Sequence, residues 1–246
     1  MGQDEGSFLE AQRAFFAEAD KAHFRWQTEN ATIAASEREL LRGFPIEMGA
    51  VLEVGCGEGG NLKNLIGARS ALRVVGLDLF ERKVAFAKAN VVGPRFVCGD
   101  ALALPFADGS FDALLCRDVL HHLAARERAL RELRRVAKPG AEIWILEPNG
   151  TNPLMRLLAM VRPHERGLLR NSVSSLCDLT RGQFPNVRAD VRQPLPLSRM
   201  LLHYEFGMAR LGRSNAVGSF FRVWDRLMGR VMPRRWWAYV LLQVKI

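Results

Sequence analysis

The sequence has few cysteines, few tyrosines and no long apolar run. Of its 246 residues, four are cysteine and two are tyrosine. The cysteines have neither paired nor C-x-x-C spacing, so we expect reduced thiols and no metal site: Cys56, Cys98, Cys116 and Cys177. No stretch approaches the roughly 20 apolar residues of a membrane span, and the acidic N-terminus has no signal-peptide core. These absences predict a cytoplasmic protein.

Acidic side chains are scarce in the C-terminal part of the chain. Residues 1–150 contain 19 Lys+Arg and 21 Asp+Glu, a balance of −2, whereas residues 151–246 contain 16 and 5, a balance of +11. Of those 16 cations, 15 are arginine. An excess this local indicates an anionic partner. No nucleic-acid-binding motif accompanies the charge, so we do not expect nucleic acid.

The arginines near the C-terminus are interleaved with apolar and aromatic residues. Arg222, Arg226, Arg230, Arg234 and Arg235 lie among Phe220, Phe221, Val223, Trp224, Leu227, Met228, Val231 and Trp236. Three interpretations stay open: recognition of a phosphate or carboxylate on a small molecule, peripheral contact with an anionic membrane at its inner face, or a solvated surface over a packed helix.

The segment Val51–Gly60 organises the rest of the chain. Three apolar, β-favouring residues and one acid predict a short buried strand, a glycine cluster follows, and residues 61–66 favour a helix. Gly55 and Gly57 allow a sharp turn and the close approach of a ligand. The helix behind them directs its free N–H groups towards that ligand. This order predicts the opening of a βαβ nucleotide-binding unit.

The glycine spacing alone is ambiguous between two classes of cofactor. Gly55, Gly57 and Gly60 match G-x-G-x-x-G, the dinucleotide fingerprint. Glu53, inside the strand, favours the other class, because a carboxylate repels a pyrophosphate but suits a ligand that carries an ammonium and a sulfonium. Glu53-x-Gly55-x-Gly57-x-Gly59 resembles the first motif of class I S-adenosylmethionine-dependent methyltransferases.

Two further acids follow predicted strands. Strand 72–78 ends in Asp78, which can accept hydrogen bonds from both ribose hydroxyls of either cofactor. After a helix over 81–90, strand 95–99 leads to Asp100. In the family resembled, an acid at this place binds the adenine amino group, and the next backbone N–H, here that of Ala101, meets the ring.

The stretch 104–123 carries the most specific resemblance. A turn over 107–110 precedes a predicted buried strand, 111–116, and a helix start. Its Leu-Pro-Phe-x-Asp-x-Ser-Phe-Asp and Leu-His-His elements resemble the small-molecule and quinone-type methyltransferases of this class. The resemblance implies a methionine end at Glu53, Gly55, Cys56 and Gly57, a ribose site at Asp78 and Leu79, adenine contacts at Asp100 and Ala101, and a backbone contact from Arg117.

The candidate catalytic residues are His121 and His122. They follow the fourth strand, where the substrate of the family faces the methyl group, and an imidazole can deprotonate an acceptor oxygen near neutral pH. The alternative is structural, with one ring packed and the other solvated. A base is needed only where the acceptor is a hydroxyl or a protonated amine, since positioning and exclusion of water supply much of the rate.

Strands and helices alternate over 51–147, which predicts an α/β fold with a doubly wound, mostly parallel, seven-stranded Rossmann-like sheet. We expect helices within 8–42, over 124–137, 152–161 and 172–181, and two last strands over 187–191 and 236–244, which the resemblance implies are paired antiparallel. A helical insertion, 198–211 and 217–231, separates those strands. We interpret 1–246 as one domain with an N-terminal helical cap (1–48), a cofactor-binding core (49–149) and a substrate-side and cap region (150–246).

The sequence thus predicts an S-adenosylmethionine-dependent methyltransferase that acts on a small-molecule or lipid-like acceptor, anionic or membrane-held. The alternative is a non-catalytic S-adenosylmethionine-binding scaffold that retains the fold. An NAD-dependent or nucleotide-sugar enzyme is disfavoured by Glu53 and by the lack of a Tyr-x-x-x-Lys pair. The pattern leaves open the methylated atom (O, N or C) and the oligomeric state.

Overall fold

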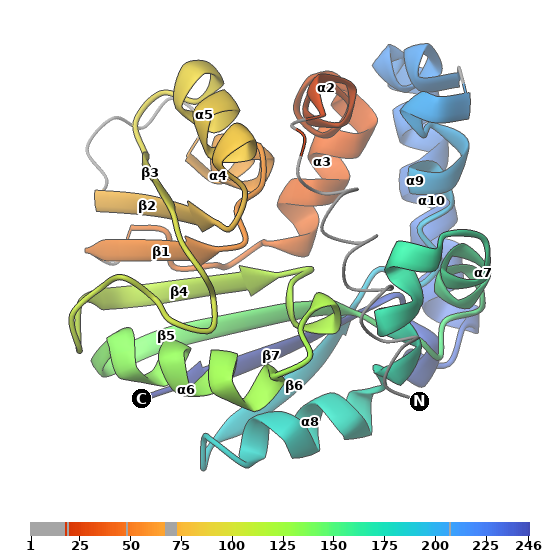
Figure 1. The fold of residues 1–246 in the computed structure, drawn as a ribbon. Helices are drawn as coiled ribbons and strands as arrows, with labels where there is room; N and C mark the ends of the chain where they lie inside the picture. Colours follow the sequence, from red (N-terminus) through yellow and green to blue (C-terminus); the bar gives the residue numbers. More distant parts are fainter. Residues whose placement is uncertain (1–17, 19, 48, 67–72, 207) are drawn as a thin grey trace.

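The computed structural model describes residues 18, 20–47, 49–66, 73–206 and 208–246. Seven strands form one sheet in the order β3-β2-β1-β4-β5-β7-β6, with β7 antiparallel to both of its neighbours (Figure 1). The strands are β1 Ala50–Val54, β2 Arg73–Asp78, β3 Arg95–Cys98, β4 Phe111–Arg117, β5 Ala137–Pro148, β6 Val187–Arg192 and β7 Tyr239–Lys245. The predicted doubly wound sheet and its antiparallel last strands are confirmed.

The central strands are buried on both faces because their apolar residues alternate between two cores. On β1, Val51 belongs to one core and Leu52 to the other. On the neighbouring β4, Leu115 and Leu114 divide in the same way. Each strand therefore anchors helices on both sides of the sheet.

Helices cover each face. On one side α2 (Lys21–Glu29), α4 (Gly60–Ile66), α5 (Glu81–Asn90) and α7 (Pro153–Val161) contribute to the first core. On the other, α6 (Arg126–Val136) and α8 (Val173–Arg181) contribute to the second. Ser172 caps α8 through a capping box with Ser175. The helix predicted over 81–90 is confirmed as α5, with the same bounds.

A third core joins the N-terminal helices to the C-terminal insertion. Asp20 and Asn30 cap α2 and α3 (Ala31–Leu40). Trp26 and Ile33 pack with Leu202 and Phe221. Leu202 directly follows α9 (Leu197–Leu201), and Phe221 lies on α10 (Asn215–Val231). The predicted helix within 8–17 lies outside the described residues, and the division into cap, core and substrate side stays a prediction.

Several predicted boundaries are wrong. The helix predicted over 198–211 is instead α9 and two 3₁₀ segments, η3 (Tyr204–Phe206) and η4 (Met208–Arg213). Tertiary contact outweighs helix propensity here: the Asn30 side-chain amide donates to the Ala209 carbonyl at 2.8 Å, and a Cβ on Gly212 would collide with the Asn30 side chain. The last strand starts at Tyr239 rather than at residue 236, because Arg234–Trp236 forms the 3₁₀ segment η5.

The helix expected over 124–137, and the helix start expected at the histidine pair, also differ from the structure. The histidines lie in a 3₁₀ turn, η1 (Leu120–His122), and α6 begins only at Arg126. Strand β5 starts at Ala137, so α6 ends one residue earlier than expected, and the Gly140 N–H in this strand donates to the carbonyl of Ile246 at 2.9 Å. Across the described ranges, no helix is both long and apolar enough to cross a membrane.

Candidate active site

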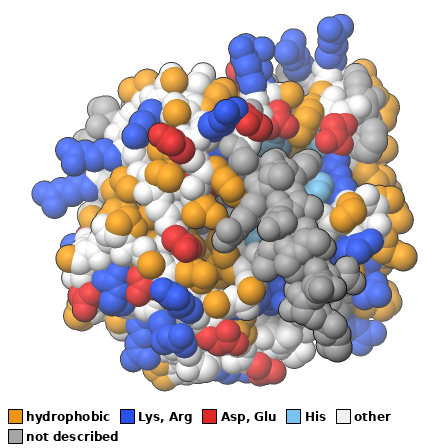
Figure 2. All heavy atoms as spheres, viewed as in Figure 1, with side chains coloured by type: hydrophobic (Ala, Val, Ile, Leu, Met, Phe, Trp, Pro, Cys, Tyr) orange, Lys and Arg blue, Asp and Glu red, His pale blue; other side chains and the backbone are white. Residues whose placement is uncertain are grey.

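A pocket of about 1030 Å³ opens at the carboxyl ends of the parallel strands. This is where ligands bind in doubly wound sheets. The predicted residues that line it together are Gly55, Cys56, Gly57, Asp78, Leu79, Asp100, Ala101, Arg117, His121 and His122. Glu53 is wholly buried in β1 and is not part of the lining. Figure 2 shows this face of the molecule, with Lys and Arg side chains gathered mainly at its edges.

The glycine loop is tied to the end of β2. The N–H groups of Gly55 and Cys56 donate to the carbonyl of Leu77 at 2.7 and 2.9 Å. Gly55 has φ +74°, and a Cβ there would collide with Val119. Gly57 has φ +52° with no atom near the position of a Cβ. The backbone therefore favours glycine at both positions, and at Gly55 the lack of space requires it as well.

Glu53 has one satisfied and one unsatisfied carboxylate oxygen. The Asn61 amide donates to Oε1 at 2.7 Å, whereas Oε2 has no hydrogen-bond partner among the residues that the structure describes. Burial raises the pKa of Glu53 to about 8, against the lowering effects of Asn61 and Arg117. A buried, incompletely satisfied acid beside a glycine loop fits the cationic amino-acid end of S-adenosylmethionine.

Asp78 lies at the end of β2 and is almost fully buried. Its two oxygens accept hydrogen bonds from the N–H of Gly57 at 2.8 Å and from the N–H of Phe80 at 3.0 Å. Each oxygen keeps a further lone pair, which suits two ribose hydroxyls. Asp100 is exposed at the rim, where it accepts the Leu102 N–H at 2.8 Å.

A buried ion network that the sequence did not reveal supports the floor of the site. The Arg117 guanidinium donates to Asn61 Oδ1 at 2.8 Å and lies 2.6 Å from Glu37 Oε2. Burial would raise the pKa of Glu37, but Arg117 and Arg199 more than offset it and bring the pKa to about 2. Glu37 comes from α3, so no local pattern links it to Arg117. The network reaches Glu53 through the shared Asn61 side chain.

Asp118 is held in an unusual backbone conformation inside the pocket. Its φ is +54°, a left-handed value that non-glycine residues rarely adopt. Its N–H donates to the Leu146 carbonyl at 3.0 Å, and its carboxylate lies 3.1 Å from Arg117 Nε. Such strain costs about 1–3 kcal/mol and concentrates at functional sites. Asp118 is a site residue that sequence reasoning missed.

The two candidate histidines have opposite environments. His121 is buried, with Nδ1 2.7 Å from Glu147 and Nε2 3.3 Å from Glu165. Burial would lower the pKa of His121, but the two carboxylates raise it to about 10. Glu147 is itself fixed by the N–H groups of Val119 and Leu120 at 2.9 and 2.8 Å. A protonated imidazole that faces a carboxylate on each side cannot take up another proton.

His122 is the neutral member of the pair. Its ring centroid lies 3.8 Å from that of His121, and burial, followed by the charge of His121, lowers the pKa of His122 to about 3. His121, His122 and Glu165 each offer one possible metal-ligand atom, and these three atoms lie within 4.8 Å of one another. Two imidazoles and a carboxylate are ligands that suit a metal ion. The contacts of His121 with Glu147 and Glu165 account for the same side chains as a buried ion-pair cluster.

The far end of the pocket is largely apolar. Its wall comes from α7, from η2 (Pro163–Arg170) and from α9. The apolar side chains are Leu154, Met155, Leu157, Leu158, Val161, Leu168 and Met200, and His164 and His203 lie among them. None of the five arginines within 222–235 lines the pocket. Two other arginines do: Arg162, which pairs with Glu205, and Arg199, which pairs with Glu37.

Comparison with known proteins places the glycine-loop unit in a family. Residues 52–145 match the methyltransferase domain model. A fatty-acid O-methyltransferase of Mycolicibacterium smegmatis is 39% identical over 97 residues, 39% of this chain and 35% of that protein. A demethylmenaquinone methyltransferase of Roseiflexus castenholzii is 34% identical over 134 residues, 53% and 52% of the two chains. The chain thus spans about a third to a half of these relatives.

The fold is shared over a longer span. A possible histamine N-methyltransferase from Thermotoga maritima superposes with a TM-score of 0.62 at 20% identity, covering 91% of this chain and 93% of that one. At this identity the likeness speaks for the fold alone. Together, the matched segment and the strand order assign residues 52–145 to the methyltransferase domain family, on the fold of the class I S-adenosylmethionine-dependent methyltransferases.

Proposed function

We propose that the protein transfers a methyl group from S-adenosylmethionine to a lipid-like small-molecule acceptor, anionic or membrane-held. The observation that carries this proposal is the continuity of one pocket, which joins the glycine loop to a chamber walled by α7, η2 and α9. When bound, the cofactor supplies a methyl group on a sulfonium, a good leaving group. The sequence family supports the reaction class.

In this proposal the cofactor is held by the residues predicted from the sequence. Glu53 attracts the ammonium group from beneath the loop, while Gly55, Cys56 and Gly57 allow the backbone to approach the methionine end. Asp78 and Leu79 hold the ribose. The adenine contacts come from Asp100 and Ala101, and the backbone of Arg117 completes the site. The buried ion pair of Arg117 with Glu37 holds α3 against the end of β4 beneath the site.

The acceptor lies against the apolar wall and His122. Catalysis then rests on orientation and on exclusion of water, which the apolar side chains provide. Where the acceptor is a hydroxyl, the neutral ring of His122 accepts its proton as a weak base, because its pKa is about 3. A fatty-acid methyltransferase among the relatives supports a lipid-like acceptor.

Cofactor binding is the first test. Calorimetry should show binding of S-adenosylhomocysteine and none of NAD. Asp78→Ala should weaken that binding by about 1.5–3 kcal/mol, roughly 10- to 150-fold, because a charged hydrogen-bond acceptor is lost. Asp108→Ala removes an exposed carboxylate outside the pocket and should leave the affinity unchanged. Binding of NAD alone would refute the cofactor assignment.

Turnover is the second test. Release of S-adenosylhomocysteine should be measured against fatty acids, isoprenoid quinols, and polar amines and phenols of similar size. We expect turnover to favour the acceptors with long apolar bodies. Cofactor binding without turnover on any of these classes would instead favour the non-catalytic scaffold interpretation. Preference for small polar acceptors would contradict the lipid-like assignment alone.

A further inference from the structure

Helix α10 presents an apolar stripe to the outside of the molecule. Phe220, Val223, Leu227 and Val231 are 57%, 52%, 48% and 69% exposed. Their spacing of three, four and four residues places them on one face of the helix. The face that packs inward uses Gly218 and Phe221 instead. The stripe is therefore additional to the apolar surface that holds α10 in the fold.

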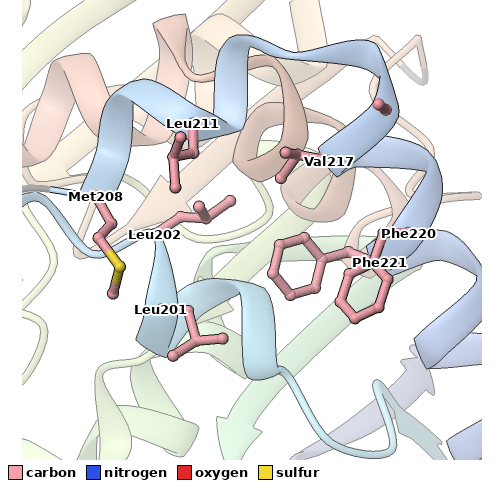
Figure 3. A pocket seen from close by; sticks show the side chains of 8 residues that line it. Leu201, Leu202, Met208, Leu211, Val217, Phe220 and Phe221 are labelled. Carbon is pink, nitrogen blue, oxygen red and sulfur yellow. The ribbon is translucent and has the colours of Figure 1, made fainter.

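An apolar groove extends this stripe towards α9. Figure 3 shows side chains from α9, η4 and α10 that surround a shared hollow. It is lined by Leu201, Leu202, Met208, Leu211, Ala216, Val217, Phe220 and Phe221. Met208 and Leu211 are 40% and 54% exposed, so the groove lies open at the surface. Its apolar walls suit a hydrocarbon chain.

Arginines flank the stripe. Arg222, Arg226 and Arg230 recur every four residues along one side of it. Within the described residues, none of these three arginines forms an ion pair with a carboxylate at 4.0 Å or less. Residues 206–246 contain eight Lys+Arg and a single acid, Asp225, which is half-buried. An exposed apolar stripe bordered by cations is the pattern of a helix that lies in the headgroup region of an anionic bilayer.

The pocket mouth lies near this face. Leu157 and Val161 on α7 line the pocket and are 54% and 69% exposed, and Met200 on α9 lines it at 37%. Residue Leu201, next on α9, lines the groove. Helix α9 thus separates the two, and Figure 1 shows α7, α9 and α10 on the same side of the sheet. Exposed apolar residues therefore continue from the pocket mouth to the stripe.

We propose that the α10 face, defined as the stripe, its three arginines and the groove, docks on an anionic lipid bilayer. Docking itself does not depend on the proposed function. Its consequence does: a membrane-held acceptor would reach the pocket without crossing water. The charge excess of the C-terminal part acts on the membrane surface, since its exposed arginines on α10 lie outside the pocket.

Vesicle co-sedimentation tests the docking directly. The probe is vesicles of 30% phosphatidylglycerol in phosphatidylcholine, with pure phosphatidylcholine as the neutral reference. We expect binding only to the anionic vesicles, and a loss of binding of tenfold or more between 50 and 500 mM salt, conditions chosen to span the range over which surface charges are screened. Binding to neither vesicle, or to both equally, would overturn the proposal.

Charge-matched variants locate the surface. Arg226→Glu with Arg230→Glu should reduce vesicle binding by tenfold or more. Arg131→Glu with Arg188→Glu makes the same change of net charge at exposed positions on α6 and β6, and should retain most of the binding. Equal loss in both variants would assign the effect to net charge and refute an α10 face.

The apolar stripe needs its own variant. Val223→Asn with Leu227→Asn keeps the charge, and should weaken vesicle binding at both low and high salt. Circular dichroism and calorimetric binding of S-adenosylhomocysteine confirm that each variant is folded. Self-association through α10, seen by light scattering and abolished by this variant while vesicle binding is absent, would identify a second copy of the chain as the occupant instead. Failure of methyl transfer on soluble acceptors would leave the vesicle result standing.

Discussion

Binding of S-adenosylhomocysteine should release a proton from Glu53. Burial holds the pKa of this carboxyl at about 8, so it is mostly protonated in the ligand-free protein at pH 7. A cationic ammonium beside it favours the carboxylate, because an opposite charge stabilises the ionised form. Ligand binding and deprotonation are therefore linked, and the linkage sets the pH dependence of affinity.

The magnitude follows from the pKa. At pH 7 a group with a pKa of about 8 is roughly nine-tenths protonated, so about 0.9 proton should leave on binding. Each pH unit below 8 adds about 1.4 kcal/mol to the cost of that deprotonation, so affinity should rise about tenfold per unit between pH 6 and 7. Above pH 8 it should level, because Glu53 is then already ionised in the ligand-free protein.

Calorimetry in two buffers of different protonation enthalpy measures the released proton. Glu53→Gln keeps the shape of the side chain but cannot ionise, so its binding should release no proton and lose the tenfold slope. A matched ligand, 5′-methylthioadenosine, lacks the ammonium and should release none from the wild-type protein. Equal proton release in Glu53→Gln and wild type would refute the assignment of Glu53.

The remaining predictions concern the histidines. His122→Ala should lower kcat on a hydroxyl acceptor by about 100-fold while cofactor affinity holds, and near-normal kcat in steady-state assays would leave positioning as the whole mechanism. His121→Ala should lower the free energy of unfolding by about 3–5 kcal/mol in urea titrations, because Glu147 is left buried without its cationic partner; a loss below 1 kcal/mol would contradict a charged pair. Since the pKa of His121 is raised to about 10, the stability of this pair is fully present below pH 6.5 and is lost as the pH rises towards 10. His121→Ala should therefore flatten the fall in unfolding midpoint over that range.

Local sequence determined the nucleotide-binding unit. Apolar residues in short runs, glycines where the backbone must take positive φ, and helix windows of suitable length specify β1, the glycine loop, α4 and α5 without reference to the rest of the chain. The acids of the site follow from the same order, because parallel strands end at one edge of the sheet. Asp78 and Asp100 therefore lie in one pocket.

Tertiary structure decided what each of the paired side chains does. Nothing local distinguishes His121 from His122, yet one faces Glu147 and Glu165 and the other is held neutral beside it. The ion pair of Glu37 with Arg117 joins residues 80 positions apart. Burial and charge at such sites depend on partners that the chain brings together only on folding, because periodicity gives the face of an element and not its neighbour.

The C-terminal part shows the same limit at larger scale. Composition predicts an anionic partner, and helical spacing predicts the stripe of α10. Only the packed structure decides that this stripe faces outward and that its arginines lie outside the pocket. The helix expected over 198–211 breaks for a related reason: contacts of Asn30 with Ala209 and Gly212 outweigh local propensity, since those contacts exist only once α3 and η4 meet.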